Sequence, residues 1–225
     1  MEAITKNILI TAHAGCMGTA ADSIESVAKG LEEGTDVIEV DVRFTNDQVP
    51  VLSHNRFSKS GISSLVKLEE VFVLIKESEH VVLNKDLKEY DAQCLSALNE
   101  IIVRTNMKDK IFFSGIQEEN TEKIKRHCPE CAYLLNYMPV NHQMENMHDA
   151  QTLLTFVNRS GAFGINLEKH FVTQEIVEIF HKNGKIVSVW TVDEKEFMEK
   201  MIGLGVDSIT TRNVELLKSL LRCFP

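Results

Sequence analysis

Two acidic residues lie close together in the apolar run Val37–Val42, and their spacing indicates shared chemistry. Glu39 and Asp41 are two residues apart. Residues two apart on a strand point to the same face, so both carboxylates would point into one interior. Neighbouring buried carboxylates repel each other unless a cation neutralises them, and oxygen ligands suit Mg²⁺ and Ca²⁺. The pair predicts a divalent-metal site; the alternatives are a polar interior, or neutralisation by Arg43 on the same face.

Two histidines lie beside this acidic pair. His13 follows the β-rich run 7–12, and His54 follows the run 49–53. A lone histidine at such a position is usually structural. Two of them beside an acidic pair are candidates for proton exchange, because imidazole titrates near neutral pH.

A further set of polar residues follows the next β-rich run. Asn84, Asp86 and Lys88 alternate along the chain, so they share one face of a strand. They would add a third carboxylate and a cation to the same end of the fold. Together with the histidines, these groups would support metal-assisted chemistry on an anion.

The elements that must position these residues alternate regularly along the chain. We expect strands over 7–12, 37–42, 80–87, 110–115, 132–138, 163–167, 185–191 and 207–211, with 49–53 extending or neighbouring the second. We expect helices over 22–33, 65–77, 92–105, 120–127, 149–158, 173–183, 194–202 and 214–222. This alternation predicts an α/β fold, a (β/α)₈ barrel with a single domain over residues 1–225. Such barrels carry functional groups at the C-terminal ends of their strands, where the residues above lie.

The composition excludes several classes of protein. The chain has 225 residues, 44% of them hydrophobic, and a net charge of −9. The acidic balance argues against nucleic acid or an anionic membrane surface as a partner. No apolar run approaches the roughly 18 residues of a transmembrane helix, and residues 1–6 do not resemble a signal region. Five scattered cysteines, including Cys128 and Cys131, predict free thiols and a cytoplasmic protein.

These motifs resemble the glycerophosphodiester phosphodiesterase family, whose members are (β/α)₈ barrels. The family signature contains His-Arg-Gly, then Gly-Ala-Asp-x-Ile-Glu-x-Asp-Val, then Val-x-x-His-Asp, and a strand in which an acid and a lysine alternate. The matching segments of this chain are 13–15, 34–42, 51–55, 83–88, 184–192 and 205–211. The similarity therefore extends over nearly the whole chain, and its first part is the most specific.

The resemblance implies roles for individual residues. It implies that three carboxylates bind Mg²⁺ or Ca²⁺: Glu39, Asp41 and Asp86. It implies that His13 and His54 form a general acid/base pair, that Lys88 holds the phosphate, and that Trp190 lines the pocket beneath the organic group. The reaction implied is cleavage of a glycerophosphodiester to an alcohol and glycerol phosphate. In the family a hydroxyl of the substrate attacks first, and water then opens the cyclic phosphate.

The chain departs from the family pattern in three positions that bear on this chemistry. Ala14 replaces the arginine that contacts phosphate, and Asp86 is one methylene shorter than the usual glutamate. The acid that usually follows the last strand is Arg212. We hypothesise that Arg212 binds substrate and supplies the cation that Ala14 lacks; the alternative is a solvent-facing arginine in a loop.

The family usually inserts a long cap after the second histidine, whereas only residues 56–66 precede the next helix here. A barrel with little or no cap has an open mouth, which predicts a bulkier small-molecule diester such as a lysophospholipid. Three functions follow: a metal-dependent glycerophosphodiester phosphodiesterase of glycerol and lipid metabolism, a phospholipase D-like hydrolase of lysophospholipids, and a non-catalytic barrel that binds a phosphorylated ligand. Retention of both histidines and all three carboxylates favours the first.

Overall fold

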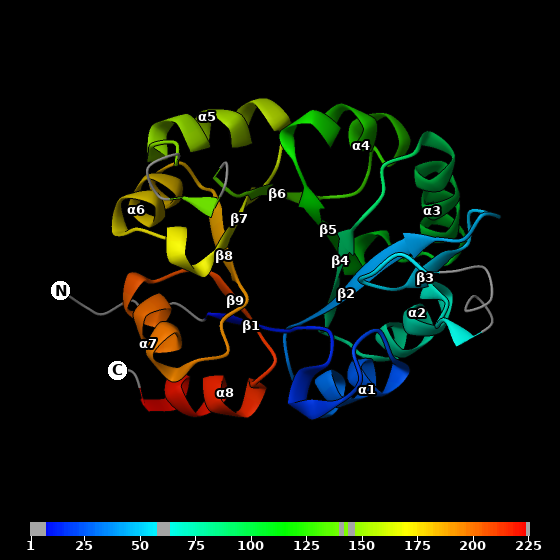
Figure 1. The fold of residues 1–225 in the computed structure, drawn as a ribbon, viewed down its shortest axis with the longest axis horizontal. Coiled ribbons are helices and arrows are strands. Elements are labelled where there is room, and N and C mark those ends of the chain that lie inside the picture. Colours follow the sequence, from blue (N-terminus) through cyan, green and yellow to red (C-terminus); the bar gives the residue numbers. More distant parts are fainter. Residues whose placement is uncertain (1–7, 58–63, 140–141, 144–146, 224–225) are drawn as a thin grey trace.

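The computed structural model describes residues 8–57, 64–139, 142–143 and 147–223, and its parallel strands form a closed barrel surrounded by helices (Figure 1). The barrel strands are β1 (Leu9–Ala12), β2 (Val37–Phe44), β4 (Val82–Leu87), β5 (Ile111–Ile116), β6 (Tyr133–Tyr137), β7 (Gly164–Glu168), β8 (Ile186–Trp190) and β9 (Ser208–Thr211). β1 pairs in parallel with both β2 and β9, which closes the sheet. The predicted (β/α)₈ barrel is confirmed.

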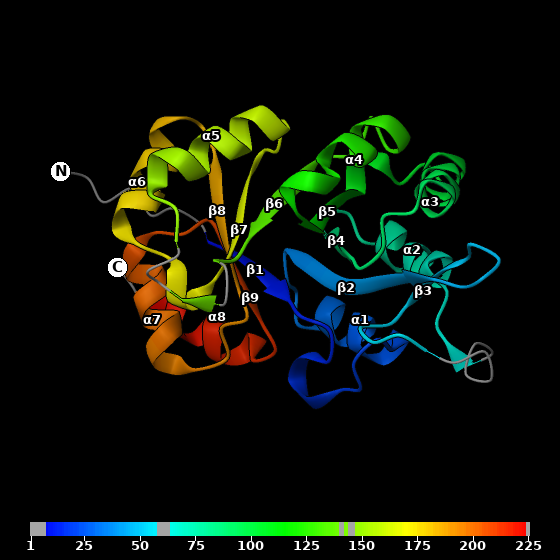
Figure 2. The same cartoon turned by 45° about the horizontal axis from the view of Figure 1, so that its top comes forward.

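A helix follows each barrel strand and packs on the outside of the barrel, as Figures 1 and 2 show. The helices are α1 (Ile24–Glu32), α2 (Leu68–Glu77), α3 (Ala92–Arg104), α4 (Thr121–His127), α5 (Ala150–Ser160), α6 (Gln174–Lys182), α7 (Lys195–Leu204) and α8 (Val214–Cys223). None of the helices in the described part of the chain is long and apolar enough to cross a membrane.

Polar side chains fix where several helices begin. Ser23, Asp91, Asp149 and Thr173 each precede a helix and accept a hydrogen bond from a backbone N–H of its first turn. Such caps contribute about 1 kcal/mol each, because those N–H groups have no partner within the helix. They therefore define the first residue of four of the helices that surround the barrel.

The strand β3 (Pro50–Leu52) pairs antiparallel with β2 and lies outside the closed barrel. It corresponds to the run 49–53, for which the sequence left open whether it extends the second strand or neighbours it; the structure shows that it neighbours it. The backbone N–H of Ser53 donates to the carbonyl of Asp41 at 3.0 Å, which brings the following His54 back to the barrel mouth. Only residues 53–67 connect β3 to α2, and of these residues 58–63 lie outside the described part.

The register between β2 and β4 brings the acidic residues together. Asp41 pairs with Asp86 across the two strands, and Glu39 pairs with Asn84. Residues paired in register on adjacent strands point to the same side of the sheet, so all four point into the barrel. The intervening β2 residues, such as Val40, are buried on the other side. The register thus places the side chains of Glu39, Asp41 and Asp86 close together inside the barrel.

Candidate active site

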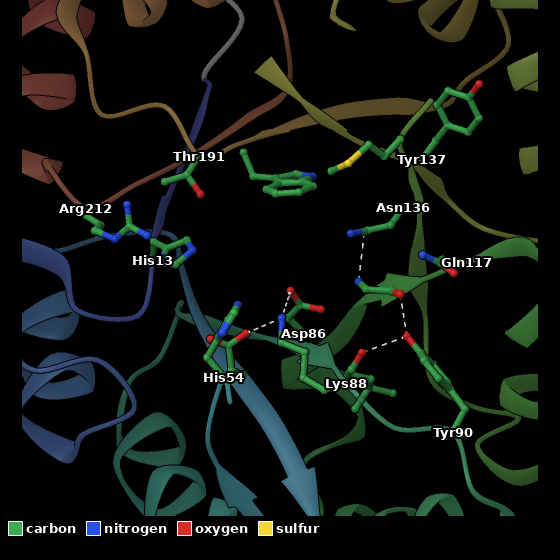
Figure 3. A pocket seen from close by; sticks show the side chains of 15 residues that line it. His13, His54, Asp86, Lys88, Tyr90, Gln117, Asn136, Tyr137, Thr191 and Arg212 are labelled. Carbon is green, nitrogen blue, oxygen red and sulfur yellow. Dashed lines mark hydrogen bonds and ion pairs between the residues drawn. The ribbon is translucent and has the colours of Figure 1, made fainter. Parts of the chain in front are cut away.

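A cavity of about 600 Å³ opens at the C-terminal ends of the barrel strands. Every site residue predicted from the sequence except Glu39 lines it: His13, Asp41, His54, Asp86, Lys88, Trp190 and Arg212. Glu39 is buried, and an oxygen of its carboxylate lies within 4.8 Å of oxygens of Asp41 and Asp86. Residues predicted from separate parts of the sequence therefore meet in one place (Figure 3).

The three carboxylates form the base of this site. Glu39, Asp41 and Asp86 each offer an oxygen, and these oxygens all lie within 4.8 Å of one another. Glu39 also accepts the backbone N–H of Ala14 at 3.1 Å, which fixes its orientation. Burial, together with the charges of Asp41 and Asp86, raises the pKa of Glu39 well above its usual range. The cluster is therefore short of positive charge, and a hard divalent cation fits its donor set.

Lys88 supplies a cation at this cluster. Its Nζ atom lies 2.7 Å from Oδ1 of Asp41 and 2.9 Å from Oδ2 of Asp86. Burial opposes the charge of Lys88, but the carboxylates of Asp86 and Asp41 outweigh burial and raise the pKa of the ammonium group. Lys88, and not Arg43, is thus the side chain that forms an ion pair with Asp41. Arg43 forms an ion pair with Glu89 at 3.0 Å.

His13 is a largely buried imidazole at the end of β1. Its Nδ1 atom lies 2.9 Å from the carbonyl oxygen of Ala14. A carbonyl only accepts, so Nδ1 carries the proton in this contact and Nε2 is left as a proton acceptor. Burial lowers the pKa of His13, and the nearby charge of Arg212 lowers it further. A neutral imidazole with a free Nε2 suits a general base.

His54 is exposed, and its backbone is held at both ends. Its N–H donates to Oδ2 of Asp22 at 2.8 Å, and its carbonyl accepts from Nε of Arg43 at 3.0 Å. Burial raises the pKa of Asp22. Asp22 and Arg43 therefore position a loop histidine that the adjacent strands alone would not fix. No pattern of residues in the sequence indicated this role of Asp22.

Arg212 and Trp190 line a further part of the cavity. Arg212 donates from Nη1 to Oδ2 of Asp193 at 2.7 Å, and its backbone N–H donates to Oδ1 of the same carboxylate at 2.7 Å. Figure 3 shows the Arg212 guanidinium beside His13, with Thr191 above. The Nε1 atom of Trp190 is buried and has no hydrogen-bond partner among the described residues. Arg212 is thus anchored at the cavity mouth.

Neutral polar residues form the wall across from His13, and the sequence analysis did not identify them. Asn136 accepts the backbone N–H of Gly115 at 3.0 Å and the amide of Asn166 at 3.1 Å. The hydroxyl of Tyr90 lies 2.5 Å from the carbonyl of Gly115. Gln117 completes this side of the cavity (Figure 3). Their positions at or just after strand ends were a usable signal, but none is charged at neutral pH, so none suggested chemistry.

A closed (β/α)₈ barrel with acidic, histidine and lysine side chains at its C-terminal mouth is typical of metal-assisted enzymes. The sequence profile of the glycerophosphoryl diester phosphodiesterase family matches residues 13–71 and 64–216 of this chain. The chain therefore belongs to this family, a family of phosphoric diester hydrolases.

Individual relatives agree with this assignment. The chain is 27% identical to a glycerophosphodiester phosphodiesterase of Caldanaerobacter subterraneus, with 95% of this chain and 98% of the relative covered. The fold matches a putative glycerophosphoryl diester phosphodiesterase of Silicibacter pomeroyi with a TM-score of 0.85 and 20% identity, over 97% of this chain and 94% of the other. It also matches an Oleispira antarctica phosphodiesterase solved with its product sn-glycerol-3-phosphate, with a TM-score of 0.80 and 17% identity, over 95% and 96% of the two chains.

Proposed function

We propose that this protein is a metal-dependent phosphodiesterase that cleaves glycerophosphodiesters to an alcohol and glycerol phosphate. The observation that carries the proposal is the convergence of Glu39, Asp41 and Asp86 within 4.8 Å beneath a cavity that His13 and His54 line. Family membership supports the reaction class, and the Oleispira protein of the same fold is described with sn-glycerol-3-phosphate as its product.

The three carboxylates would hold Mg²⁺ or Ca²⁺. When bound, such an ion neutralises phosphate oxygens and stabilises the negative charge that develops during phosphoryl transfer. Lys88 contributes a second positive charge at the same place, since its Nζ lies between Asp41 and Asp86. Arg212 contributes a third from the other side of the cavity, where the family arginine is replaced by Ala14. A chain of net charge −9 requires such local cations to bind an anion.

The two histidines would transfer the protons of the reaction. His13 accepts a proton from a glycerol hydroxyl of the substrate, whose oxygen forms a bond to phosphorus. The bond from phosphorus to the leaving alcohol then breaks, and His54 donates a proton to that alcohol. Water opens the resulting cyclic phosphate by the reverse use of the same pair. The low pKa and buried position of His13 support its assignment as the base.

The short connection between β3 and α2, residues 53–67, supports a second candidate, a phospholipase D-like hydrolase that acts on lysophospholipids. The resemblance to the family leads us to expect a long insertion at this position, and a shorter connection would leave more room for a bulky substrate. Trp190 would then contact the organic group at the cavity wall. We also propose a cytoplasmic location, because all five cysteines are free thiols.

The test is an assay of glycerophosphocholine, lysophosphatidylcholine and bis-p-nitrophenyl phosphate with Mg²⁺, Ca²⁺ or a chelator. We expect metal-dependent turnover that His13→Ala and His54→Ala each reduce by about 10²-fold or more. His80→Ala, an exposed histidine that does not line the cavity, is the matched control and should retain activity. Turnover that survives both site variants would contradict the proposed acid/base pair. Tight ligand binding without turnover would indicate a non-catalytic barrel.

A further inference from the structure

A second hollow, of about 760 Å³, lies directly beside the proposed active site. It is lined by the connection between β4 and α3 and by residues of α4, and it shares Lys88 and Tyr90 with the active-site cavity. Because the two share these residues, the second hollow is adjacent to the active-site cavity. We call the second hollow the basic groove.

Three cationic side chains line the groove and make it positively charged: Arg56, Lys123 and Arg126. All three are exposed, and none forms an ion pair within the part of the chain that the structure describes. Lys123 donates a hydrogen bond to the side-chain oxygen of Asn120 at 3.2 Å. Lys123 and Arg126 are three residues apart on α4 and so present their charges on the same face.

The groove also contains two carboxylates, and both are engaged elsewhere. Glu89 forms the 3.0 Å ion pair with Arg43 and accepts the backbone N–H of Phe44 at 3.3 Å. Asp91 caps α3 by accepting the backbone N–H of Gln93 at 2.9 Å. Glu89 is thus compensated by Arg43, whereas Asp91 keeps its single negative charge beside the three cations. A protein of net charge −9 thus has a local excess of positive charge next to its proposed active site.

We propose that the basic groove binds a second phosphate of the substrate, so that the preferred diester carries a further phosphate on the alcohol that leaves. This proposal rests on the proposed function, because the diester itself is placed at Lys88 and the carboxylates. The hydroxyl of Tyr90 is already held by the backbone carbonyls of Leu87 and Gly115. Tyr90 is therefore a fixed part of the boundary between the two hollows, and the proposed substrate would extend past it.

The side of the cavity that the leaving alcohol occupies agrees with this placement. His54, which would protonate that alcohol, is two residues from Arg56 in the chain, and Arg56 lines the groove. The natural substrate class is therefore a polyol phosphate joined to glycerol through a phosphodiester. An anionic membrane is the less favoured occupant, because the groove is concave and the net charge of the whole chain repels such a surface.

The experiment compares two diesters that differ only in one phosphate: glycerophosphoglycerol, and the same compound phosphorylated on its terminal hydroxyl. We expect a higher kcat/KM for the phosphorylated diester, and a preference that falls as salt is raised. Lys123→Gln and Arg126→Gln should each reduce this preference on the order of fivefold, with kcat/KM for glycerophosphoglycerol unchanged. Lys195→Gln, which removes an equal charge on α7 across the barrel, should leave the preference intact (Figure 1).

Equal kcat/KM for the two diesters, or a preference that survives in both groove variants, would overturn the inference and leave the proposed function standing. If neither diester is cleaved with either metal, the proposed function is wrong. In that case the affinity for glycerol bisphosphate, measured by calorimetry, tests the inference. If Arg126→Gln binds glycerol bisphosphate as tightly as the wild type does, the proposed role of the basic groove is contradicted. A further outcome would also overturn the inference. If the protein binds phosphatidylglycerol vesicles, Arg126→Gln abolishes this binding, and the two diesters are cleaved equally well, then the groove binds a membrane surface.

Discussion

Gly115 packs directly against Asp86: a Cβ atom added to Gly115 would lie 2.1 Å from Oδ1 of Asp86 and 2.7 Å from the carbonyl oxygen of Leu87. Gly115 also has a φ of 78°, in the left-handed region that favours glycine, and it lies where the register between β5 and β6 shifts. The backbone of β5 thus contacts a proposed metal ligand. No side chain fits between the two.

We predict that Gly115→Ala displaces Asp86. The variant should unfold about 1–3 kcal/mol more easily, because it combines a steric clash with a strained backbone. It should also lose most of the rise in melting temperature that Mg²⁺ or Ca²⁺ produces in the wild type. Gly203→Ala is the control, because a Cβ atom there meets nothing within 4 Å. A wild-type response to metal in Gly115→Ala would contradict the assignment of Asp86.

A second prediction concerns Glu39, whose charge is unfavourable without a cation. Burial and the neighbouring carboxylates raise its pKa, so Glu39→Gln should leave the metal-free protein as stable as the wild type or more stable. Glutamine can still accept the N–H of Ala14. The variant should nevertheless lose the stabilisation by metal, which is about 2.7 kcal/mol for a ligand at a hundred times its Kd. Thermal unfolding with and without metal measures both effects.

The exposed Glu175→Gln is the matched control for this experiment, since it removes one carboxylate of α6 that is not part of the cluster. It should respond to metal as the wild type does. A Glu39→Gln variant that is destabilised without metal and still stabilised by it would show that Glu39 has a structural role only.

The sequence predicted the barrel and the acidic cluster because both depend on local periodicity. The spacing of Glu39 and Asp41 determines their face on a strand, and alternating elements determine which strands are neighbours. The direction of Arg43 could not be predicted, because its partner Glu89 lies on another segment. The contact of Gly115 with Asp86 depends on a local shift of register between β5 and β6, and the residue types in these strands do not predict that shift.

The basic groove was also beyond prediction, for a different reason. Its cations come from the loop after β3 and from α4, and its remaining wall comes from the connection after β4. Although α4 is rich in basic residues, its sequence alone does not show which of them face the active site. Only the fold shows that Glu89 pairs with Arg43 and that the three cations have no ion-pair partner among the described residues.

Arg212 provides a third prediction. If Arg212 replaces the phosphate-binding arginine absent at Ala14, Arg212→Gln should lower kcat/KM on the order of tenfold or more, since a charged hydrogen bond contributes about 1.5–3 kcal/mol. The free energy of unfolding should change by less than about 1 kcal/mol, because the ion pair with Asp193 is half exposed. Arg104→Gln breaks an exposed ion pair with Glu69 away from the cavity and should keep full activity. Equal activities of the two variants would make Arg212 a loop residue.

The last prediction concerns Lys85, which points away from the barrel interior and is fully buried. Its Nζ has no hydrogen-bond partner among the described residues and lies 4.7 Å from the centre of the Phe113 ring. Burial lowers the pKa of Lys85 to about 7. The unfolded lysine has a pKa of about 10.4, so between these values the unfolded chain binds more protons, and stability rises with pH.

Lys85→Met keeps the length of this side chain and removes its charge, so it should stabilise the protein. The gain should be larger at pH 6 than at pH 9 by roughly 2 kcal/mol, because at pH 6 the wild type must bury an ammonium group, whereas at pH 9 it buries a neutral amine. Urea unfolding at the two pH values, with chelator present, measures the difference. Lys195→Met, at an exposed lysine of α7, is the control. The difference in unfolding free energy between this variant and the wild type should be the same at both pH values. If Lys85→Met and the wild type differ equally at both pH values, Lys85 keeps its proton in the fold, and one of its neighbours must compensate the charge.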